Sequence, residues 1–334
     1  MLSVTIVLFR PNVDDFKVTV ASLLANADDI ASLHVLVSGT RKEYSAVESL
    51  LCELSSATKC FTHHRFDNLG FASGHNLLLA EAFRSGADSV LVLNPDVVLQ
   101  PESFRKLAAV AGLHQQPVLW GPTLSRATDD GVPTQTFDSA GIGWTSTGRH
   151  FDKSQGDPWR IQTGQHEIVM GVTGACLVVN RSSFDQLISD SGHFFDDLFL
   201  AYREDAELGI RASTLGIPSA VVHLDGFAHV RSVRGYQRGN RLADLLGVRN
   251  RFLLRWSLGN SRPGKPLVAG ARDLLVILAS SLVERRSLPG LRDAFAIRRY
   301  ASYRGRNWRR VAAERVSQQQ GEGGRGQALR TSIG

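Results

Sequence analysis

The feature of the sequence that most constrains its fold is an alternation of short apolar runs and helix-like stretches through about residue 120. Apolar runs at 4–9, 34–37 and 90–93 and an extended piece near Phe61 are separated by stretches whose apolar residues repeat at helical spacing. This β-α-β-α-β-α-β order predicts an α/β fold in which helices cover both faces of a mostly parallel sheet. Since ligands of such sheets bind beyond the carboxyl ends of the strands, functional residues are expected there.

Three groups of polar residues fall at the predicted ends of elements. Asn94 and Asp96 follow the apolar run at 90–93, Glu204 and Asp205 begin an amphipathic helix over 202–216, and His229 follows the strand-like segment SAVVHL. The positive end of a helix dipole stabilises ionised carboxylates in the first turn. Asp and His suit Mn²⁺ or Mg²⁺, which commonly bridge a protein to phosphate oxygens. The pattern predicts a metal-diphosphate site with one carboxylate left as a base, and a turn plus an ordinary capped helix is the alternative.

Length and cysteine content limit the classes of protein to consider. With 334 residues, 43% of them hydrophobic, the chain can bury a full core and suits one large or two unequal domains. The three cysteines, Cys52, Cys60 and Cys176, have spacings that suit neither a disulfide framework nor a zinc site, so a reducing cytoplasm is expected. The apolar runs at 4–9 and 274–283 are too short to span a bilayer, and the first is also too short for a signal peptide.

Positive charge is concentrated in the last third of the chain. Residues 1–230 hold 16 basic and 26 acidic residues, whereas residues 231–334 hold 22 basic and 6 acidic residues. Within 285–315 there are ten arginines, interleaved with Tyr300, Tyr303 and Trp308. Such a segment suits nucleic acid or the cytoplasmic lipid leaflet, and a solvated helical face is the alternative.

Several segments, in this order and spacing, resemble the family 2 glycosyltransferases of the GT-A fold, most closely their bacterial rhamnosyltransferase-like and galactofuranosyltransferase-like branch. They are DNLGFASGHN (67–76), LNPDVVL (93–99), DSAGIGWTSTG (138–148), TGACLVVNR (173–181), and FDDLFLAYREDAELGIRASTLG (195–216) followed by His229. The resemblance implies a Rossmann-like, nucleotide-sugar-binding GT-A domain over 1–235. A helical, basic C-terminal region over 236–315 and a Gly-rich, disordered tail over 316–334 are expected to follow it.

The resemblance also implies roles for the polar residues. Asp96 takes the place of the last acid of the metal-binding Asp-x-Asp motif, with Asn94 in the place of its first Asp, and His229 completes the metal shell. Asp205 matches the catalytic base, while Glu204 beside it positions the acceptor or the loop.

Further residues are implied to lie along the donor or near its sugar: Asn68, Gly70, Phe71, Asn76, Gly174 and Ala175. Two departures from the family leave open whether the nucleobase of the donor is uracil or thymine. The segment VLVSGT stands where many members have an Asp-Asn-x-Ser/Thr motif, and Phe9 and Arg10 stand where relatives often have a Tyr-Asn pair. Phe9 and Arg10 are therefore expected to contact the nucleotide differently, and an exposed structural arginine is the alternative for Arg10.

Together these features predict an inverting, metal-dependent enzyme, because one base opposite a metal-bound diphosphate gives a single in-line displacement. It would move a sugar, with rhamnose favoured, from a dTDP- or UDP-sugar to a hydroxyl of a cell-envelope glycan or polyprenyl-linked acceptor. The expected location is the cytoplasm, on the inner face of the cell membrane, with the basic region on anionic lipid. Transfer of galactofuranose or glucose, a non-catalytic nucleotide- or glycan-binding module, nucleic-acid binding by the tail, and a homodimer stay open.

Overall fold

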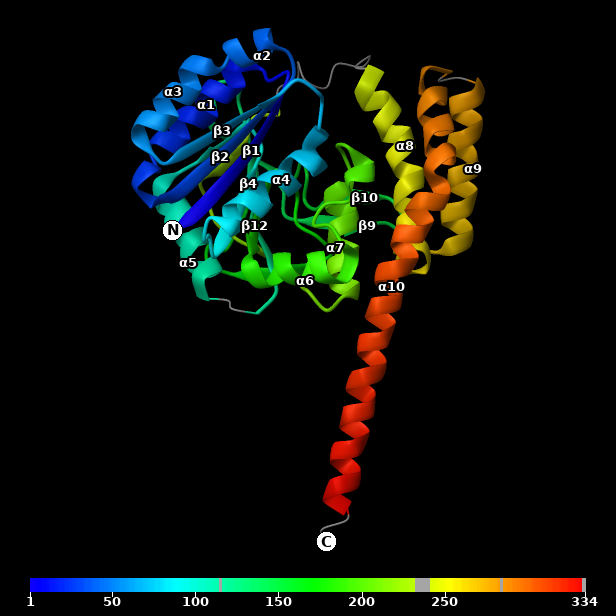
Figure 1. Cartoon of the computed structure of the whole chain (residues 1–334). Helices are drawn as coiled ribbons and strands as arrows, with labels where there is room; N and C mark the ends of the chain where they lie inside the picture. Colours follow the sequence, from blue (N-terminus) through cyan, green and yellow to red (C-terminus); the bar gives the residue numbers. More distant parts are fainter. Residues whose placement is uncertain (114–115, 232–240, 283–284, 332–334) are drawn as a thin grey trace.

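The computed structural model of the chain describes residues 1–113, 116–231, 241–282 and 285–331. Its centre is an eight-stranded sheet with the order β11-β13-β6-β12-β4-β1-β2-β3 (Figure 1). The strands are β1 (Leu2–Phe9), β2 (Ile30–Ser38), β3 (Cys60–Arg65), β4 (Ser89–Leu93), β6 (Leu119–Pro122), β11 (His166–Val169), β12 (Cys176–Asn180) and β13 (Ser219–Val222). Strands β3, β2, β1 and β4 are parallel, whereas β12 and β11 run antiparallel to their neighbours. The mostly parallel α/β sheet predicted from the sequence is therefore confirmed.

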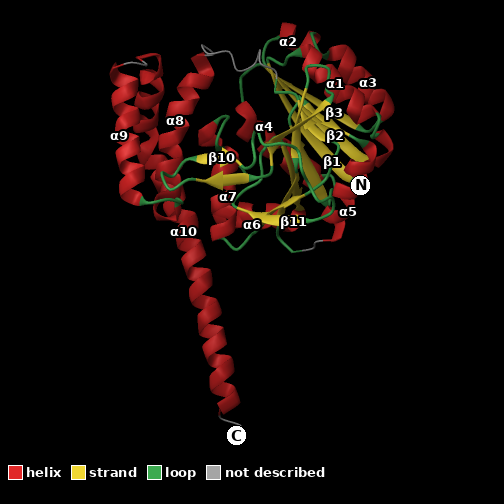
Figure 2. Cartoon of the chain, turned by 180° about the vertical axis from the view of Figure 1, so that it is seen from behind, coloured by secondary structure: helices red, strands yellow, loops and turns green. Residues whose placement is uncertain are grey.

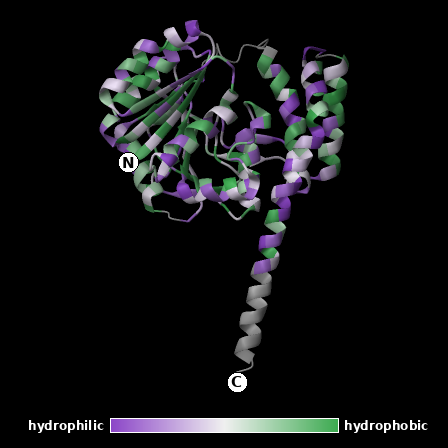
Figure 3. Cartoon of the chain, in the orientation of Figure 1, coloured by the Kyte–Doolittle hydropathy of each residue, from purple (hydrophilic) through white to green (hydrophobic). Residues whose placement is uncertain are grey.

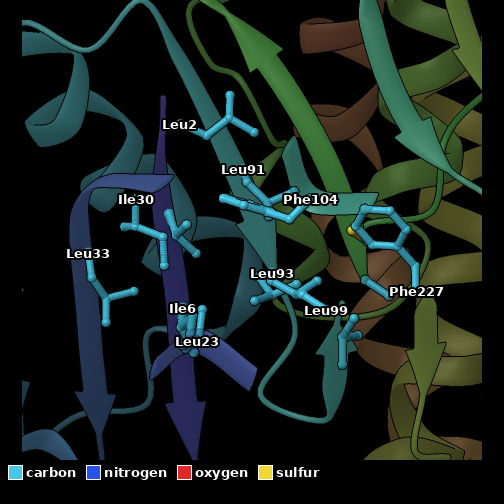
Figure 4. Close-up of a cluster of buried hydrophobic side chains, with 14 of the residues drawn as sticks. Leu2, Ile6, Leu23, Ile30, Leu33, Leu91, Leu93, Leu99, Phe104 and Phe227 are labelled. Atoms are coloured by element: carbon cyan, nitrogen blue, oxygen red, sulfur yellow. The ribbon is translucent and has the colours of Figure 1, made fainter. Parts of the chain in front are cut away.

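Helices cover both faces of this sheet, whose central strands are rich in hydrophobic residues (Figure 3). On β4, Leu91 and Leu93 belong to one core cluster, whereas Val90 and Val92 belong to the other. The first cluster includes residues of three helices, α1 (Val13–Leu24), α3 (Glu48–Ala57) and α5 (Pro101–Leu113), and part of it is drawn in Figure 4. The second includes residues of α4 (Gly70–Arg84), α6 (Arg181–Ser191) and α7 (Glu204–Thr214).

A smaller sheet lies beyond the end of β4. Residues 94–96 form the short break after which β5 (Val97–Leu99) begins the order β5-β14-β7-β8. Its other strands are β7 (Leu124–Ala127), β8 (Pro133–Ser139) and β14 (Phe227–His229), and a separate hairpin is made by β9 (Ile142–Trp144) and β10 (His150–Asp152). The break at 94–96 thus carries the chain from one sheet to the other.

The C-terminal part is helical, as predicted, and packs against the body beside α7 and the β9–β10 hairpin (Figure 2). It consists of α8 (Arg241–Leu258), α9 (Pro266–Leu282) and α10 (Leu288–Thr331). Trp308 of α10 is buried in a cluster with Phe199 and Ile210 of the body, and Arg304 forms an ion pair with Asp196 at 2.6 Å. Short helical segments complete the described chain: α2 (Arg41–Ser45), η1 (Ala27–Asp29), η2 (Asp197–Phe199), η3 (Gly259–Ser261) and η4 (Arg285–Ser287).

The end of α10 differs from the sequence-based expectation. The Gly-rich segment over 316–334 is predicted to be disordered, whereas the helix continues to Thr331. Extending a helix that packing has already nucleated costs far less than starting one, and Gln, Glu, Ala and Arg all favour helix. In the part of the chain that the structure describes, no single helix is both long and apolar enough to cross a membrane.

Candidate active site

The turn after β4 and the end of β14 bring Asp96 and His229 together. Asn94 fixes the start of the turn by donating its backbone N–H to the Ala175 carbonyl at 2.9 Å, and Val230 donates its N–H to the Asp96 carbonyl at 2.8 Å. Between these two anchors, Asp96 Oδ1 lies 3.2 Å from His229 Nε2. The two residues that the sequence predicts as metal ligands are therefore neighbours, although they are far apart in the chain.

Asp138 of β8 holds the other side of the same histidine. Its Oδ2 accepts a hydrogen bond from His229 Nδ1 at 2.8 Å, and its side chain is buried. Burial opposes a charge on His229, but Asp96 and Asp138 outweigh it and raise the pKa of the imidazole to about 10. With Nδ1–H donated to Asp138, Nε2 is the ring atom that faces Asp96.

This arrangement suits a divalent ion. A carboxylate oxygen and an imidazole nitrogen are donors that Mn²⁺ accepts, and a carboxylate on the second ring nitrogen is the usual support of a metal-binding histidine. Among the described residues no group of three His, Cys, Asp or Glu side chains is placed to hold a metal. Asp96 and His229 would thus leave the remaining positions to phosphate oxygens and water, as is common for Mg²⁺ and similar ions.

Arg231 connects the Asp96–His229 pair with Asp152 on the Asp205 side of the site. The sequence does not predict Arg231 as a site residue. Its Nε lies 2.7 Å from Asp138 Oδ1 in an ion pair, and its Nη2 donates a hydrogen bond to Asp152 Oδ2 of β10 at 2.8 Å. Asp138 and Asp152 were likewise not predicted as site residues. A signal was present for Arg231, because a residue two positions after His229 on an extended segment faces the same side.

Asp205 and Glu204 begin α7 and differ in what surrounds them. Asp205 receives two backbone N–H groups, from Gly174 at 3.1 Å and from Ala206 at 2.7 Å. Burial and the charge of Asp152 raise its pKa, while these N–H donors oppose the shift. Glu204 is buried, and its Oε2 has no hydrogen-bond partner among the described residues. Burial and the charge of Asp205 raise the pKa of Glu204 well above its ordinary value, which favours the protonated form of Glu204.

The segment 67–76 is brought to the same region by close backbone packing. Asn68 Oδ1 accepts the N–H of Gly70 at 2.9 Å, and Ala72 donates its N–H to the Leu200 carbonyl at 3.1 Å. Gly70 has φ +70°, and a Cβ there would lie 2.4 Å from the Leu200 oxygen, so only glycine fits. The α4 start is thereby fixed next to the loop that precedes α7.

Phe71 and Gly174, both predicted to line the donor, are in contact. A Cβ on Gly174 would lie 3.1 Å from the Phe71 ring, which also packs against His75 with a 4.4 Å centroid distance. Ala175 is buried next to them and accepts the Asn94 N–H. The glycine therefore leaves room for the aromatic ring beside Asp205.

Two other residues that are predicted to contact the donor, Asn76 and Arg10, have partners within the chain. Asn76 uses both ends of its amide on the backbone of Phe195, accepting its N–H and donating to its carbonyl, each at 2.8 Å. Its amide is thus committed to holding the 195 segment. Arg10 pairs with Glu43 at 3.2 Å and lies over the Phe9 ring at 5.3 Å, with 75% of its side chain exposed. This ion pair favours the structural alternative for Arg10.

Comparison with curated proteins gives two kinds of relative, and no family model matches the chain. The chain is 24% identical over 246 residues to the low-salt glycan biosynthesis hexosyltransferase Agl10 of Haloferax volcanii, which covers 72% of this chain and 75% of the relative. It is 26% identical over 223 residues to the N-acetylglucosaminyl-diphospho-decaprenol L-rhamnosyltransferase of Mycobacterium tuberculosis, which covers 58% of this chain and 70% of the relative.

Solved structures share the fold at low identity. GalNAc-T7 with UDP, GalNAc and Mn²⁺ matches with a TM-score of 0.53 and 14% identity, covering 78% of this chain, which spans only 51% of that chain. Residues 1–349 of TarS from S. aureus match with a TM-score of 0.51 and 13% identity, covering 95% of this chain and 91% of that chain. The fold is that of the GT-A glycosyltransferases. The fold and the curated relatives together support the prediction from the sequence that the chain is a hexosyltransferase similar to family 2.

Proposed function

We propose that the chain transfers a hexose, with rhamnose favoured, from a nucleotide-diphosphate sugar to an acceptor hydroxyl, with a divalent metal and with inversion at the anomeric carbon. One observation carries this proposal: the Asp96–His229 pair and the Asp205 carboxylate are tied to one site through Arg231, Asp138 and Asp152. A transfer reaction needs both a group that stabilises the leaving diphosphate and a base for the nucleophile.

On the donor side, Asp96 and His229 would hold Mn²⁺ or Mg²⁺, which when bound neutralises charge on the leaving diphosphate. Asp138 accepts the Nδ1–H of His229 and so keeps Nε2 turned towards Asp96, and Nε2 would lose its proton when a metal binds. Arg231 balances the charge of Asp138 and keeps that carboxylate in place. These contacts orient the site before the donor binds, so little reorganisation is needed.

On the acceptor side, Asp205 accepts the proton of the attacking hydroxyl. Backbone N–H groups of Gly174 and Ala206 hold its carboxylate, and its raised pKa makes it a stronger base than an ordinary aspartate. The raised pKa of Glu204 favours its protonated form, which adds no second charge beside the nucleophile. With Asp205 as the base on one face of the sugar and the diphosphate leaving from the other, the transfer proceeds in one displacement and the anomeric configuration inverts.

Substitution of Asp205 tests the chemical step. For Asp205→Asn we expect turnover to fall about 10²–10⁴-fold, because general-base assistance is lost. Mn²⁺-dependent binding of the nucleoside diphosphate, measured by calorimetry, should stay close to that of the wild type. Near-normal turnover of this variant would remove Asp205 from the mechanism, and NMR of the product anomer tests inversion directly.

Substitution of Asp96 tests the metal separately. Asp96→Ala should lose the part of donor affinity that depends on Mn²⁺ or Mg²⁺, measured by calorimetry with and without the metal. If the wild type and Asp96→Ala bind the donor with the same affinity, both with and without the metal, the metal assignment is refuted. A thermal-shift screen of dTDP- and UDP-sugars identifies the donor, since a ligand that binds the folded state raises its melting temperature. The named activity of the mycobacterial relative favours a rhamnose donor, and galactofuranose and glucose donors are the alternatives to include.

We also propose a lipid-linked acceptor and docking on an anionic cytoplasmic membrane surface. Every exposed residue of α9 is apolar: Pro266, Leu267, Val268, Ala271, Leu274, Leu275, Leu278, Ala279 and Leu282. An arginine-rich segment follows directly, beginning at Arg285 and Arg286. Apolar faces flanked by basic residues are typical of helices that lie in the headgroup region of anionic bilayers.

A further inference from the structure

Three arginines lie around the β9–β10 hairpin without an acidic partner among the described residues. Arg149 is in the hairpin turn, Arg203 directly precedes α7, and Arg272 is on α9. The guanidinium groups of Arg149 and Arg203 have no hydrogen bond or ion pair within the described chain, and Arg272 Nη1 donates to Thr147 Oγ1 at 3.3 Å. All three charges are therefore available to an external anion.

Asp273, the acid next to Arg272 on α9, already has arginine partners. Asp273 of α9 accepts hydrogen bonds from Arg251 at 2.9 Å, from Arg262 at 3.2 Å and from Arg255. Arg262 also donates to the Gly148 carbonyl at 3.1 Å, which ties this second group of arginines to the hairpin next to Arg149. Three arginines thus share the Asp273 carboxylate, and the positive charge around the hairpin exceeds the negative charge that they meet.

The excess positive charge disfavours further protonation of the groups around it. Burial and the neighbouring charges of Arg251, Arg272, Arg149 and Arg262 lower the pKa of Arg203 to about 10. His150 lies among the same charges, and burial together with Arg203 and Arg149 lowers its pKa to about 3, so it is neutral. Its Nδ1 is buried and has no hydrogen-bond partner in the described chain. An anion bound here would relieve the mutual repulsion of the arginines.

Arg149, Arg203 and Arg272 lie on the Asp205 side of the site. His150 and Asp152 are two positions apart on β10, so they face the same side and are about 7 Å apart. Asp152 is the acid whose charge raises the pKa of Asp205, and Arg203 precedes Asp205 by two residues. By contrast, the charges that act on His229 are those of Asp96 and Asp138.

We propose that Arg149, Arg203 and Arg272 form a subsite for a phosphate or diphosphate group of the acceptor. Guanidinium groups bind phosphate oxygens through paired, charge-assisted hydrogen bonds. The inference rests on the proposed function, and it assigns the acceptor to the sugars that are linked to a lipid through phosphate. The hydroxyl of such a sugar would sit at Asp205 while its phosphate meets the arginines. Arg272 also borders the exposed apolar face of α9, where the lipid chain would continue.

The experiment uses the full chain with Arg149→Gln and Arg272→Gln, singly and together. Arg149 is exposed in a turn, so its single variant tests the subsite without a risk to folding. The probes are a short-chain prenyl-diphosphate-linked N-acetylglucosamine and a matched alkyl N-acetylglucosaminide without phosphate, titrated by calorimetry. Each substitution should weaken binding of the diphosphate probe by about tenfold or more. Arg105→Gln, on the distant α5, is the matched control and should bind like the wild type.

Three results would overturn the subsite: no binding of the diphosphate probe by the wild type, equal binding by the double variant, or an equal loss for the phosphate-free glycoside. A loss of Mn²⁺-dependent nucleoside diphosphate affinity in the double variant would assign the arginines to the donor, which also overturns the proposal. The proposed function fails independently, when the wild type transfers no sugar from any nucleotide-sugar. Diphosphate-probe binding that depends on these arginines would support the subsite even then.

Discussion

Asp152 acts on the candidate base through its charge alone, since no hydrogen bond joins it to Asp205 in the described structure. Burial is the largest cause of the raised pKa of Asp205, and the negative charge of Asp152 raises it further. Asp152 is itself held by Arg231 at 2.8 Å. The base works only when deprotonated, so activity should fall as the pH drops through this raised pKa. The environment of one carboxylate therefore sets the acid limit of the reaction.

Asp152→Asn should move that limit to lower pH. Removing the negative charge makes ionisation of Asp205 easier, and Arg231 then keeps a positive charge that is less balanced, which acts in the same direction. The measurement is the pH dependence of kcat/KM with a nucleotide-sugar and acceptor. Asp157→Asn, an exposed acid in the same segment, is the control. An acid limb that stays at the wild-type pH would show that Asp152 does not tune the base.

Asp138 is the residue on which the orientation of His229 depends. Asp138→Asn keeps the shape but removes the charge that binds His229 Nδ1 and Arg231. Carboxylates that support a metal-bound histidine typically contribute about 10–100-fold in metal affinity, so we expect Mn²⁺-dependent donor binding to weaken by a similar factor. Calorimetry measures it, with Asp129→Asn, an exposed acid before β8, as control. Unchanged donor affinity would contradict the role.

At the scale of elements, the position of α7 depends on a close approach to the loop before β12. A Cβ on Gly209 would lie 2.4 Å from the Met170 carbonyl oxygen and 2.6 Å from the Gly171 Cα. Backbone atoms cannot move aside as side chains do, so Gly209→Ala must push α7 away. Because Asp205 begins this helix, a shift of α7 also displaces the candidate base.

We therefore expect Gly209→Ala to destabilise the protein by about 1–3 kcal/mol, the usual range for overpacking, and to lower turnover. Urea denaturation measures the first effect. The matched control is Gly247→Ala in α8, where a Cβ meets nothing within 4 Å. This control should gain about 0.5–1 kcal/mol because alanine favours helix over glycine. Equal stability of Gly209→Ala and the wild type would mean that α7 is not held by this contact.

The elements themselves were largely predictable, and the pairing between distant ones was not. The period of the apolar residues identifies β1, β2, β4 and the helices between them. Asp138 went unassigned because its role arises only when β8 joins the small sheet and faces His229, 91 residues away. Likewise, nothing local in the sequence indicates that the amide of Asn76, which is predicted to lie along the donor, has the backbone of Phe195 as its partner. The roles of Asp96, Asp205 and His229 are predicted from family spacing, which carries long-range information that periodicity lacks.

For the whole molecule, buried neutral histidines should make stability depend on pH. Burial lowers the pKa of His75 to about 3, and burial with nearby arginines lowers that of His150 to about 3 and that of His193 to about 2. These histidines become protonated near pH 6.5 in the unfolded chain, whereas in the folded chain they stay neutral at that pH. Stability present above pH 6.5 is thus lost as the pH falls below it, by about 1.4 kcal/mol per pH unit for each histidine.

His193→Gln isolates one of these contributions. Between pH 6 and pH 5, the free energy of unfolding of this variant should change by about 1.4 kcal/mol less per pH unit than that of the wild type, apart from any constant offset. Urea denaturation at the two pH values provides the comparison. The same substitution at the exposed His166 is the control. If both variants keep the wild-type pH slope, His193 is not protonated on unfolding in this range.

The last prediction concerns how the molecule meets its acceptor. Truncation before α9 would not isolate membrane binding, because Trp308 is only 1% exposed and packs on the body. Instead, Leu267, Leu275 and Leu282 are 90%, 65% and 72% exposed, so changing all three to Gln removes apolar surface without opening the core. A leucine buried in lipid contributes about 1.5–3 kcal/mol, so the triple variant should no longer float with anionic vesicles. Ile168→Gln, 66% exposed on β11, should float like the wild type. Flotation that survives the triple substitution would assign membrane binding to the arginines alone.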